Sequence, residues 1–99
     1  YEAGIYITNQ TVMFVYIPKS VGVTNVAITG DFNSWDEEGT PMEEAYPGIW
    51  IKSMKLDYGI YEYKYIINNG EKKIHDPAGN ASMPDGKGEK NSIIEIDME

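Results

Sequence analysis

The feature that most constrains the fold is an alternation of side-chain types over residues 60–67, whose sequence is IYEYKYII. Tyrosines occupy positions 61, 63 and 65, and Ile67 continues their series. Successive side chains of a β-strand point to opposite faces of its sheet. The pattern therefore predicts a strand with a tyrosine stripe on one face, toward a core, and with Glu62, Lys64 and Ile66 on the other.

The rest of the chain shows short β-branched and aromatic runs separated by turn residues, which is typical of antiparallel strands. Further strands are predicted over residues 5–8, 12–17, 23–29 and 92–96, over a segment carrying Trp50, Met54 and Leu56, and over a short return strand at residues 71–74. Residues 68–70 (NNG) predict a hairpin turn, because Asn and Gly tolerate a positive φ angle. Residues 76–90, rich in Gly, Pro, Asp and Asn, are expected to form a long loop. No segment of useful length has the helical period, so we predict an all-β, antiparallel β-sandwich.

Composition limits both the number of domains and the partners. The chain has 99 residues, of which 41% are hydrophobic, so residues 1–99 are expected to form one domain with one core. Sixteen acidic residues face eight basic ones, all lysines, and the net charge of -8 argues against DNA, RNA and anionic membranes as partners. The absence of cysteine excludes disulfides and thiolate nucleophiles. No apolar run approaches the roughly 18 residues that span a bilayer, and the cellular location is left open.

Residues 30–35 (GDFNSW) stand out because an apolar strand, predicted to end at Thr29, runs into a turn that ends in a large aromatic residue. Turn residues do not bury a tryptophan by themselves. Two uses of Trp35 are therefore open. Its indole either folds back as a plug on the core, or is presented on the loop as a flat apolar platform for a ring-shaped ligand.

The residues that could support catalysis or metal binding form weak patterns. His75 is the only histidine, and its neighbour Asp76 would point the opposite way on an extended chain, so the two cannot act as a base and its orienting partner. Five oxygen-bearing side chains on one loop could be drawn as a calcium site: Asp31, Asn33, Asp36, Glu37 and Glu38. Their spacing is not that of an EF-hand loop, and a solvated acidic loop is favoured. We therefore predict no catalytic residue, no metal and no cofactor.

Sugar binding is the chemistry that suits the remaining residues. Neutral glucans are bound by an aromatic ring that stacks on the apolar side of a pyranose, with amide and ammonium groups that hydrogen-bond to hydroxyls. Trp35, Lys64 and asparagines of the loops could supply these groups. Trp50 and the tyrosine stripe are instead expected in the core, where the tyrosine hydroxyls must find partners.

Several segments, in order along nearly the whole chain, carry a resemblance to a known family. They are residues 26–35 (VAITGDFNSW), 40–42 (TPM), 58–70 (YGIYEYKYIINNG), 75–77 (HDP) and 90–96 (KNSIIEI). The combination resembles the family-48 carbohydrate-binding modules. These modules include the glycogen-binding domain in the β subunit of AMP-activated protein kinase and the early-set domains that precede the catalytic barrels of isoamylase, pullulanase and glycogen-branching enzymes. The resemblance implies an immunoglobulin-like β-sandwich of the early-set type and an α-glucan ligand.

The resemblance also implies which residues contact the glucan. Kinase-type members hold it with two tryptophans, a lysine, an asparagine and a leucine on a projecting loop. The first tryptophan falls on Trp35, the lysine on Lys64 and the asparagine on Asn91. Lys73 stands where the second tryptophan is expected, and residues 85–88 (DGKG) replace the leucine loop. By analogy with stacking on other planar ligands, losing one aromatic face costs on the order of 1 to 3 kcal/mol of binding free energy.

The residues and the resemblance together leave three functions open. The favoured one is non-catalytic binding of α-1,4-linked glucan, such as glycogen, starch or a maltooligosaccharide, because three of the five contact positions keep suitable chemistry. The second is a packing domain beside an adjoining catalytic domain of a larger amylolytic enzyme, with a weakened sugar site. The third is a regulatory module that docks on a partner subunit, as the kinase β subunit does, and it rests on fold analogy alone.

Overall fold

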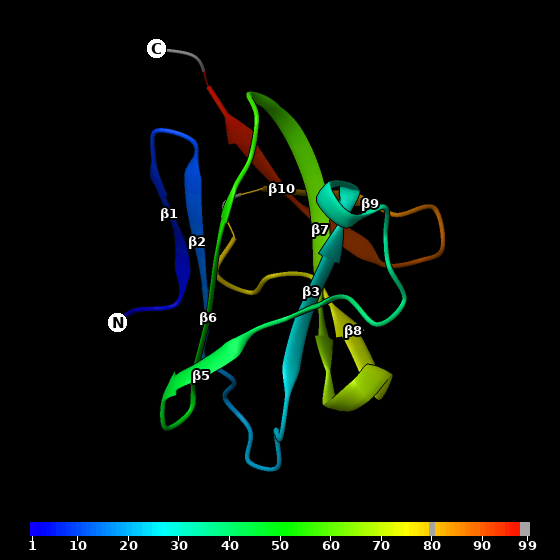
Figure 1. Ribbon diagram of the computed structural model, residues 1–99. Helices are drawn as coiled ribbons and strands as arrows, with labels where there is room; N and C mark the ends of the chain where they lie inside the picture. Colours follow the sequence, from blue (N-terminus) through cyan, green and yellow to red (C-terminus); the bar gives the residue numbers. More distant parts are fainter. Residues whose placement is uncertain (80, 98–99) are drawn as a thin grey trace.

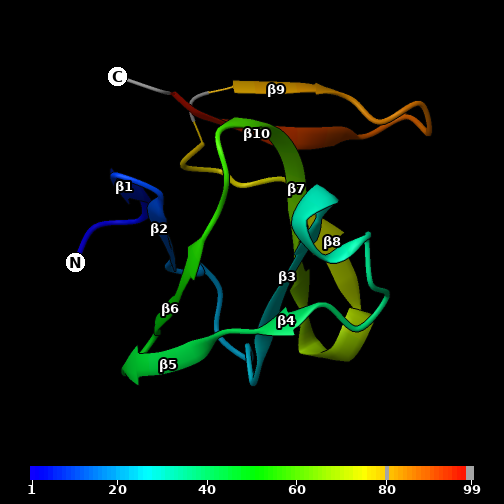
Figure 2. The same ribbon diagram turned by 45° about the horizontal axis from the view of Figure 1, so that its top comes forward.

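Two antiparallel sheets pack face to face in the computed structural model, which describes residues 1–79 and 81–97 (Figure 1). The first sheet comprises, in spatial order, β1 (Gly4–Thr8), β2 (Thr11–Tyr16), β6 (Ile49–Lys55) and β5 (Glu43–Tyr46). The second comprises, in spatial order, β4 (Thr40–Pro41), β3 (Val26–Gly30), β7 (Gly59–Ile67), β10 (Lys90–Ile96) and β9 (Ala81–Pro84), and β8 (Lys72–Ile74) also pairs with β7. Figure 2 shows β9 lying beside β10 at one edge of the second sheet. The predicted all-β sandwich is confirmed.

Two short 3-10 helices, η1 (Asp31–Asn33) and η2 (Asn68–Gly70), make up the helical part of the described residues. The first follows β3 directly and begins the turn that ends in Trp35. The second is the predicted hairpin turn between β7 and β8, and the φ angles of its three residues are 51°, 58° and 99°. No helix within residues 1–79 and 81–97 is long and apolar enough to cross a membrane.

The second sheet is built around β7. Its residues 63–67 pair with β3, while residues 59–63 pair with β10 and residues 65–67 with β8. The predicted alternation is confirmed, because Tyr63 and Tyr65 are fully buried toward the first sheet. Lys64 lies on the opposite side, directly across from Thr29 of β3. This side of the second sheet, which faces away from the first sheet, is called the outer face below.

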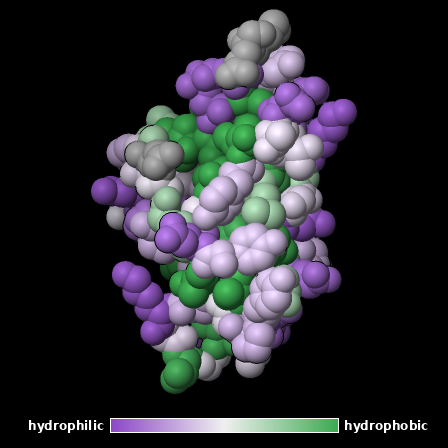
Figure 3. All heavy atoms as spheres, turned by 90° about the vertical axis from the view of Figure 1, so that its left-hand side faces the viewer, coloured by the Kyte–Doolittle hydropathy of each residue, from purple (hydrophilic) through white to green (hydrophobic). Residues whose placement is uncertain are grey.

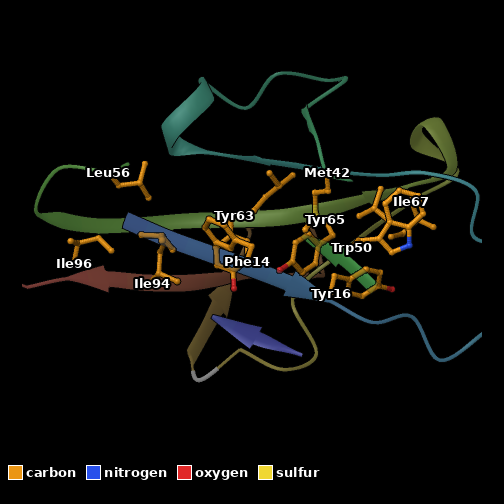
Figure 4. Packing of buried hydrophobic residues seen from close by; sticks show 13 residues of the cluster. Phe14, Tyr16, Met42, Trp50, Leu56, Tyr63, Tyr65, Ile67, Ile94 and Ile96 are labelled. Atoms are coloured by element: carbon orange, nitrogen blue, oxygen red, sulfur yellow. The ribbon is translucent and has the colours of Figure 1, made fainter. Parts of the chain in front are cut away.

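The core lies between the two sheets, where aliphatic side chains surround a group of aromatic rings from β2, β6 and β7 (Figure 4). The rings of Phe14 and Tyr63 lie 5.2 Å apart, and those of Tyr16 and Tyr65 lie 4.9 Å apart. Each such aromatic pair contributes roughly 0.5 to 1.5 kcal/mol beyond the burial of its surface. Trp50 of β6 is buried in the same cluster, as predicted.

Asp76, which follows β8 and is 2% exposed, is the partner that the buried tyrosine hydroxyls require. The hydroxyl of Tyr63 donates to Asp76 Oδ2 at 2.7 Å, and that of Tyr65 donates to the same oxygen at 3.4 Å. The backbone N–H of Asp76 donates to Ser92 Oγ at 2.6 Å. Burial, followed by the charge of Asp76, raises the pKa of both tyrosines. This buried network ties the segment after β8 to the core.

The structure corrects the predicted strands in three places. The strand expected over residues 23–29 begins only at Val26, because the N–H and hydroxyl of Thr24 bond to the side chain of Asn68 instead of to a strand. The predicted loop at residues 76–90 contains β9, which pairs with β10. The strands β4 and β5 have no counterpart in the prediction. Because β5 and β9 are edge strands with exposed side chains, their sequences lack apolar alternation.

Candidate functional site

Polar side chains gather on the outer face, where the alternation along β7 and its neighbours places them. Lys64 of β7 lies beside Thr29 of β3, as their register requires. Asn91 of β10 precedes Ser92, which is buried toward the core, so Asn91 faces outward. Lys73 of β8 pairs with the residue two positions after Lys64 and therefore projects from the same face.

The outer face is hollowed between the end of β3, β8 and the turn that joins β9 to β10. This hollow has a volume of about 520 Å³ and is lined by Thr29, Trp35, Glu37, Lys64, Lys73, Asp85, Lys87, Glu89 and Asn91. All four residues predicted for the site are among them, namely Trp35, Lys64, Lys73 and Asn91. They come from the turn after η1 and from three different strands, so the fold brings together residues that are far apart in the sequence.

The two open uses of the aromatic residue after β3 are divided between two side chains. Phe32 of η1 is half-buried and packs against the core, with its ring 6.0 Å from that of Phe14 and 6.4 Å from that of Tyr61. Trp35 lines the hollow and is 37% exposed. Phe32 is therefore the plug, and Trp35 is the aromatic residue presented at the hollow.

The backbone that presents Trp35 has an unusual conformation. The φ angles of Ser34 and Trp35 are 58° and 55°, in the left-handed region that bulky residues rarely adopt. The side chain of Asn33 stabilises this turn, since it accepts from the N–H of Gly30 at 3.0 Å and donates to the carbonyl of Ile28 at 3.0 Å. Backbone strain of this kind costs on the order of 1 to 3 kcal/mol per residue and is concentrated at binding and catalytic sites.

Lys64 is paired within the protein. Its Nζ donates to Asp85 Oδ2 at 2.8 Å and lies 3.8 Å from a carboxylate oxygen of Glu89. The side chains of Lys64 and Asp85 are only 11% and 9% exposed, so this close pair is largely shielded from water. The hydrogen bond from Lys64, helped by that from the backbone N–H of Lys87, lowers the pKa of Asp85 to about 2.

Two more of the predicted residues also bond to carboxylates. The indole Nε1 of Trp35 donates to Asp31 Oδ1 at 2.9 Å, and Nδ2 of Asn91 donates to Glu62 Oε1 at 3.0 Å. Lys73 is exposed at the rim. The hollow therefore offers one partly exposed aromatic ring beside amide and ammonium groups whose orientation is already set by the protein.

The alternatives of metal binding and catalysis gain no support from the geometry. The side chains of Asp31 and Asn33 are engaged in hydrogen bonds of the turn. In the part of the chain that the structure describes, no group of three or more His, Asp or Glu side chains is arranged to hold a metal ion. His75 is exposed while Asp76 is buried, so these neighbours face opposite ways, as expected.

Sequence reasoning did not assign a role at the site to the carboxylates of Asp31, Glu62 and Asp85. The alternation along β7 does place Glu62 on the same face as Lys64, and this signal was available. An Asp-Gly pair at residues 85–86 predicts a turn. The family resemblance places residues 85–88 at the glucan site, but no sequence signal predicts that Asp85 pairs with Lys64, 21 positions away.

Comparison with known proteins gives the family. The family model described as the glycogen recognition site of AMP-activated protein kinase matches residues 13–99. The 1,4-alpha-glucan branching enzyme GlgB of Prochlorococcus marinus subsp. pastoris is 37% identical over 73 residues, which are 72% of this chain and 9% of the enzyme. GlgB of Prochlorococcus marinus strain MIT 9301 is 35% identical over 54 residues, which are 54% of this chain and 7% of the enzyme. The chain thus spans less than a tenth of the length of these relatives. Because the family model covers most of its length, the chain belongs to the family of glycogen recognition sites of AMP-activated protein kinase, the family-48 carbohydrate-binding modules.

Proposed function

We propose that this domain binds neutral α-1,4-linked glucan, such as glycogen, starch or a maltooligosaccharide, without catalysing a reaction on it. The observation that carries the proposal is the hollow, where the exposed ring of Trp35 lies together with Lys64 and Asn91. Membership in a glycogen-recognition family supports the same class of ligand.

Each of these side chains supplies a different contact. The indole of Trp35 offers a flat apolar face to a pyranose ring. An ammonium group has three donors, and the close bond to Asp85 uses one of those of Lys64, which leaves donors for sugar hydroxyls. Asn91 donates to Glu62 through its NH₂ group and keeps a carbonyl oxygen that can accept from a hydroxyl.

The charges of the hollow suit a neutral ligand. Three acidic side chains line it, those of Glu37, Asp85 and Glu89, and three lysines line it as well. Their formal charges cancel, so the hollow has no excess charge for an anionic or cationic ligand to neutralise. Among the residues that the structure describes, Trp35 supplies the single aromatic ring that lines the hollow, and we therefore expect dissociation constants in the millimolar range.

The test is a titration of the domain with maltoheptaose and with β-cyclodextrin, followed by amide chemical shifts and tryptophan fluorescence. Wild-type protein is expected to saturate, and Trp35→Ala to bind at least about tenfold more weakly, since it removes the aromatic anchor. Tyr58→Ala removes another exposed ring, from the turn between β6 and β7, and serves as the control. Absence of saturation by the wild-type protein at millimolar glucan, or equal binding by Trp35→Ala, contradicts the proposal.

Packing against another domain or subunit is a second candidate function. It is favoured by the surface around β1, in the first sheet. On the side of the molecule where β1 and β2 lie, apolar residues reach the surface between polar ones (Figure 3). In β1, Tyr6 and Ile7 are 42% and 45% exposed, and the rings of Tyr1 and Tyr46 lie 5.8 Å apart. Such exposed apolar residues, when they form a patch, are typical of a contact with another domain or subunit.

This second candidate is tested by hydrogen exchange of the β1 amides, measured in residues 1–99 alone and in the natural full-length chain. An adjoining catalytic domain or a partner subunit that covers β1 would slow the exchange in the full-length chain. Equal exchange rates in the two samples contradict the packing role, and they leave glucan binding as the function of the domain.

A further inference from the structure

A carboxylate lies behind each of the three side chains proposed to contact the sugar. The contacts are Asp31 Oδ1 with Trp35 Nε1 at 2.9 Å, Asp85 Oδ2 with Lys64 Nζ at 2.8 Å, and Glu62 Oε1 with Asn91 Nδ2 at 3.0 Å. In each pair the nitrogen donates and the carboxylate accepts. The three donors are therefore oriented before any ligand binds.

The two aspartates divide their oxygens between the backbone and a side chain. Oδ2 of Asp31 accepts from the backbone N–H of Glu62 at 2.8 Å, which ties η1 to β7. Oδ1 of Asp85 accepts from the backbone N–H groups of Lys87 and Glu89 at 2.7 and 3.1 Å, which closes the turn between β9 and β10. Rotation of either carboxylate would break these backbone bonds. Each aspartate therefore has a fixed direction for the N–H group that it accepts through its other oxygen.

We propose that Asp31 and Asp85 are positioning residues of the glucan site, Asp31 for the indole of Trp35 and Asp85 for the ammonium of Lys64. The inference rests on the proposed glucan binding and deepens it. Neither aspartate has to touch the sugar. A long side chain that is ordered only on binding loses rotamer freedom at that step, so bonds that fix it beforehand strengthen binding.

Substitution by asparagine separates the two tasks of each aspartate. Asparagine keeps one oxygen, which can still accept the backbone N–H groups, but its NH₂ group cannot accept from Trp35 or Lys64. We expect Asp31→Asn and Asp85→Asn each to weaken maltoheptaose binding about tenfold, the loss typical of a hydrogen bond to a charged group. Glu95→Gln makes the same change of charge at an exposed position of β10 that does not line the hollow, and it should bind like wild-type protein.

A double-mutant cycle distinguishes positioning from a general structural effect. Because Asp85 is proposed to act through Lys64, Asp85→Asn is expected to have no further effect on binding in a Lys64→Met background. Chemical shifts follow the titrations, since they report millimolar affinities. Equal losses in both backgrounds, or no loss in the wild-type background, would overturn the role of Asp85.

The role of Asp31 has a readout that needs no ligand. The indole N–H of Trp35 is expected to exchange with solvent several-fold faster in Asp31→Asn than in wild-type protein, because its acceptor has gone. An unchanged exchange rate overturns the positioning of Trp35 by Asp31. If wild-type protein fails to bind glucan, the proposed function is wrong; if wild-type protein binds and both asparagine variants bind equally well, only the positioning inference is wrong.

Discussion

On the inner face of β7, Tyr63 and Tyr65 donate to the carboxylate of Asp76, and on the outer face Lys64, which lies between them in sequence, donates to Asp85. The inner contact is enclosed, since both tyrosines are fully buried and Asp76 is 2% exposed. The outer contact borders the hollow, where a charged donor faces a surface that a ligand can reach. Three consecutive residues thus place the same kind of bond in two environments.

The two contacts differ in depth, and depth determines what each carboxylate does in this domain. Buried polar groups must be paired, and removing one partner leaves the others unsatisfied, so the inner contact is expected to govern stability. The outer pair is only 11% and 9% exposed, but it lines a hollow rather than the core, so a group left without its partner there can still reach water and the loss is expected to cost the fold less. Its main consequence is the orientation of Lys64. Variants of the two contacts should therefore separate an effect on stability from an effect on the orientation of Lys64.

The largest effect is expected for Asp76→Ala, which leaves the hydroxyls of Tyr63 and Tyr65 without their acceptor. Each unsatisfied buried group costs roughly 1 to 3 kcal/mol, so the free energy of unfolding should fall by about 3 kcal/mol or more. Urea denaturation of Asp76→Ala and Asp85→Asn measures the contrast. A loss of stability for Asp85→Asn as large as that for Asp76→Ala would break the division between the two faces.

Gly30→Ala is expected to disturb both faces, because Gly30 ends β3 at the point where the turn toward Trp35 begins. A Cβ atom at this position would lie 2.8 Å from Tyr63 Cβ and also against the Glu62 carbonyl, both of which are part of β7. Overpacking against a fixed strand costs typically 1 to 3 kcal/mol, so the free energy of unfolding should fall by about 2 kcal/mol, and glucan binding should weaken as well.

The control for Gly30→Ala is Gly79→Ala, where the nearest atom to an added Cβ would be 3.3 Å away, in Asp76. This variant is expected to lose much less stability in the same urea titration. Equal losses of stability at the two glycines would show that the close contact between β3 and β7 at Gly30 does not exclude a Cβ atom.

Lys73→Trp adds a second aromatic face at the rim of the hollow and should change glucan affinity without changing stability. Because Lys73 is exposed, the free energy of unfolding should change little, while stacking on a sugar should add about 1 kcal/mol of binding free energy, or roughly fivefold in affinity. Lys72→Trp is the matched control, since adjacent residues of β8 project to opposite faces. Equal affinities of the two variants for maltoheptaose would show that the side chain at position 73 does not contact the bound glucan.

Much of the fold could be predicted because β7 carries its own pattern. Alternation over residues 60–67 identifies the strand, its core face and the face that bears Lys64, and each follows from the local geometry of an extended chain. The edge strands β5 and β9 were missed because all of their side chains are exposed. Their pairing depends on hydrogen bonds to β6 and β10, and these leave no apolar period in the sequence.

The candidate site could be predicted only in part, for a related reason. Trp35, Lys64 and Asn91 were assigned from family resemblance and ring chemistry, and Lys73 from a departure from the family pattern. The carboxylates behind them meet their partners through tertiary contacts, such as that between Asn91 and Glu62, which are 29 positions apart. The sequence likewise does not predict that Phe32 is the plug, because Phe32 and Trp35 both carry an apolar ring that could pack on the core.

The smallest expected effect concerns pH and again separates the two faces. The pKa of Asp85 is lowered to about 2 from an ordinary value of 3.8, chiefly by Lys64, so its ionised form stabilises the fold above about pH 4. This contribution should be lost as the pH falls from about 4 to about 2. For Tyr63 and Tyr65 the pKa is raised by burial, so their contribution is present below about pH 10 and should be lost in more alkaline solution.

Urea denaturation of wild-type protein and Asp85→Asn between pH 2 and 5 measures the contribution of Asp85, because the other carboxylates are present in both proteins. The difference between the two should shrink as the pH falls, whereas a difference that stays constant would show that Lys64 does not depress the pKa of Asp85 in the folded domain.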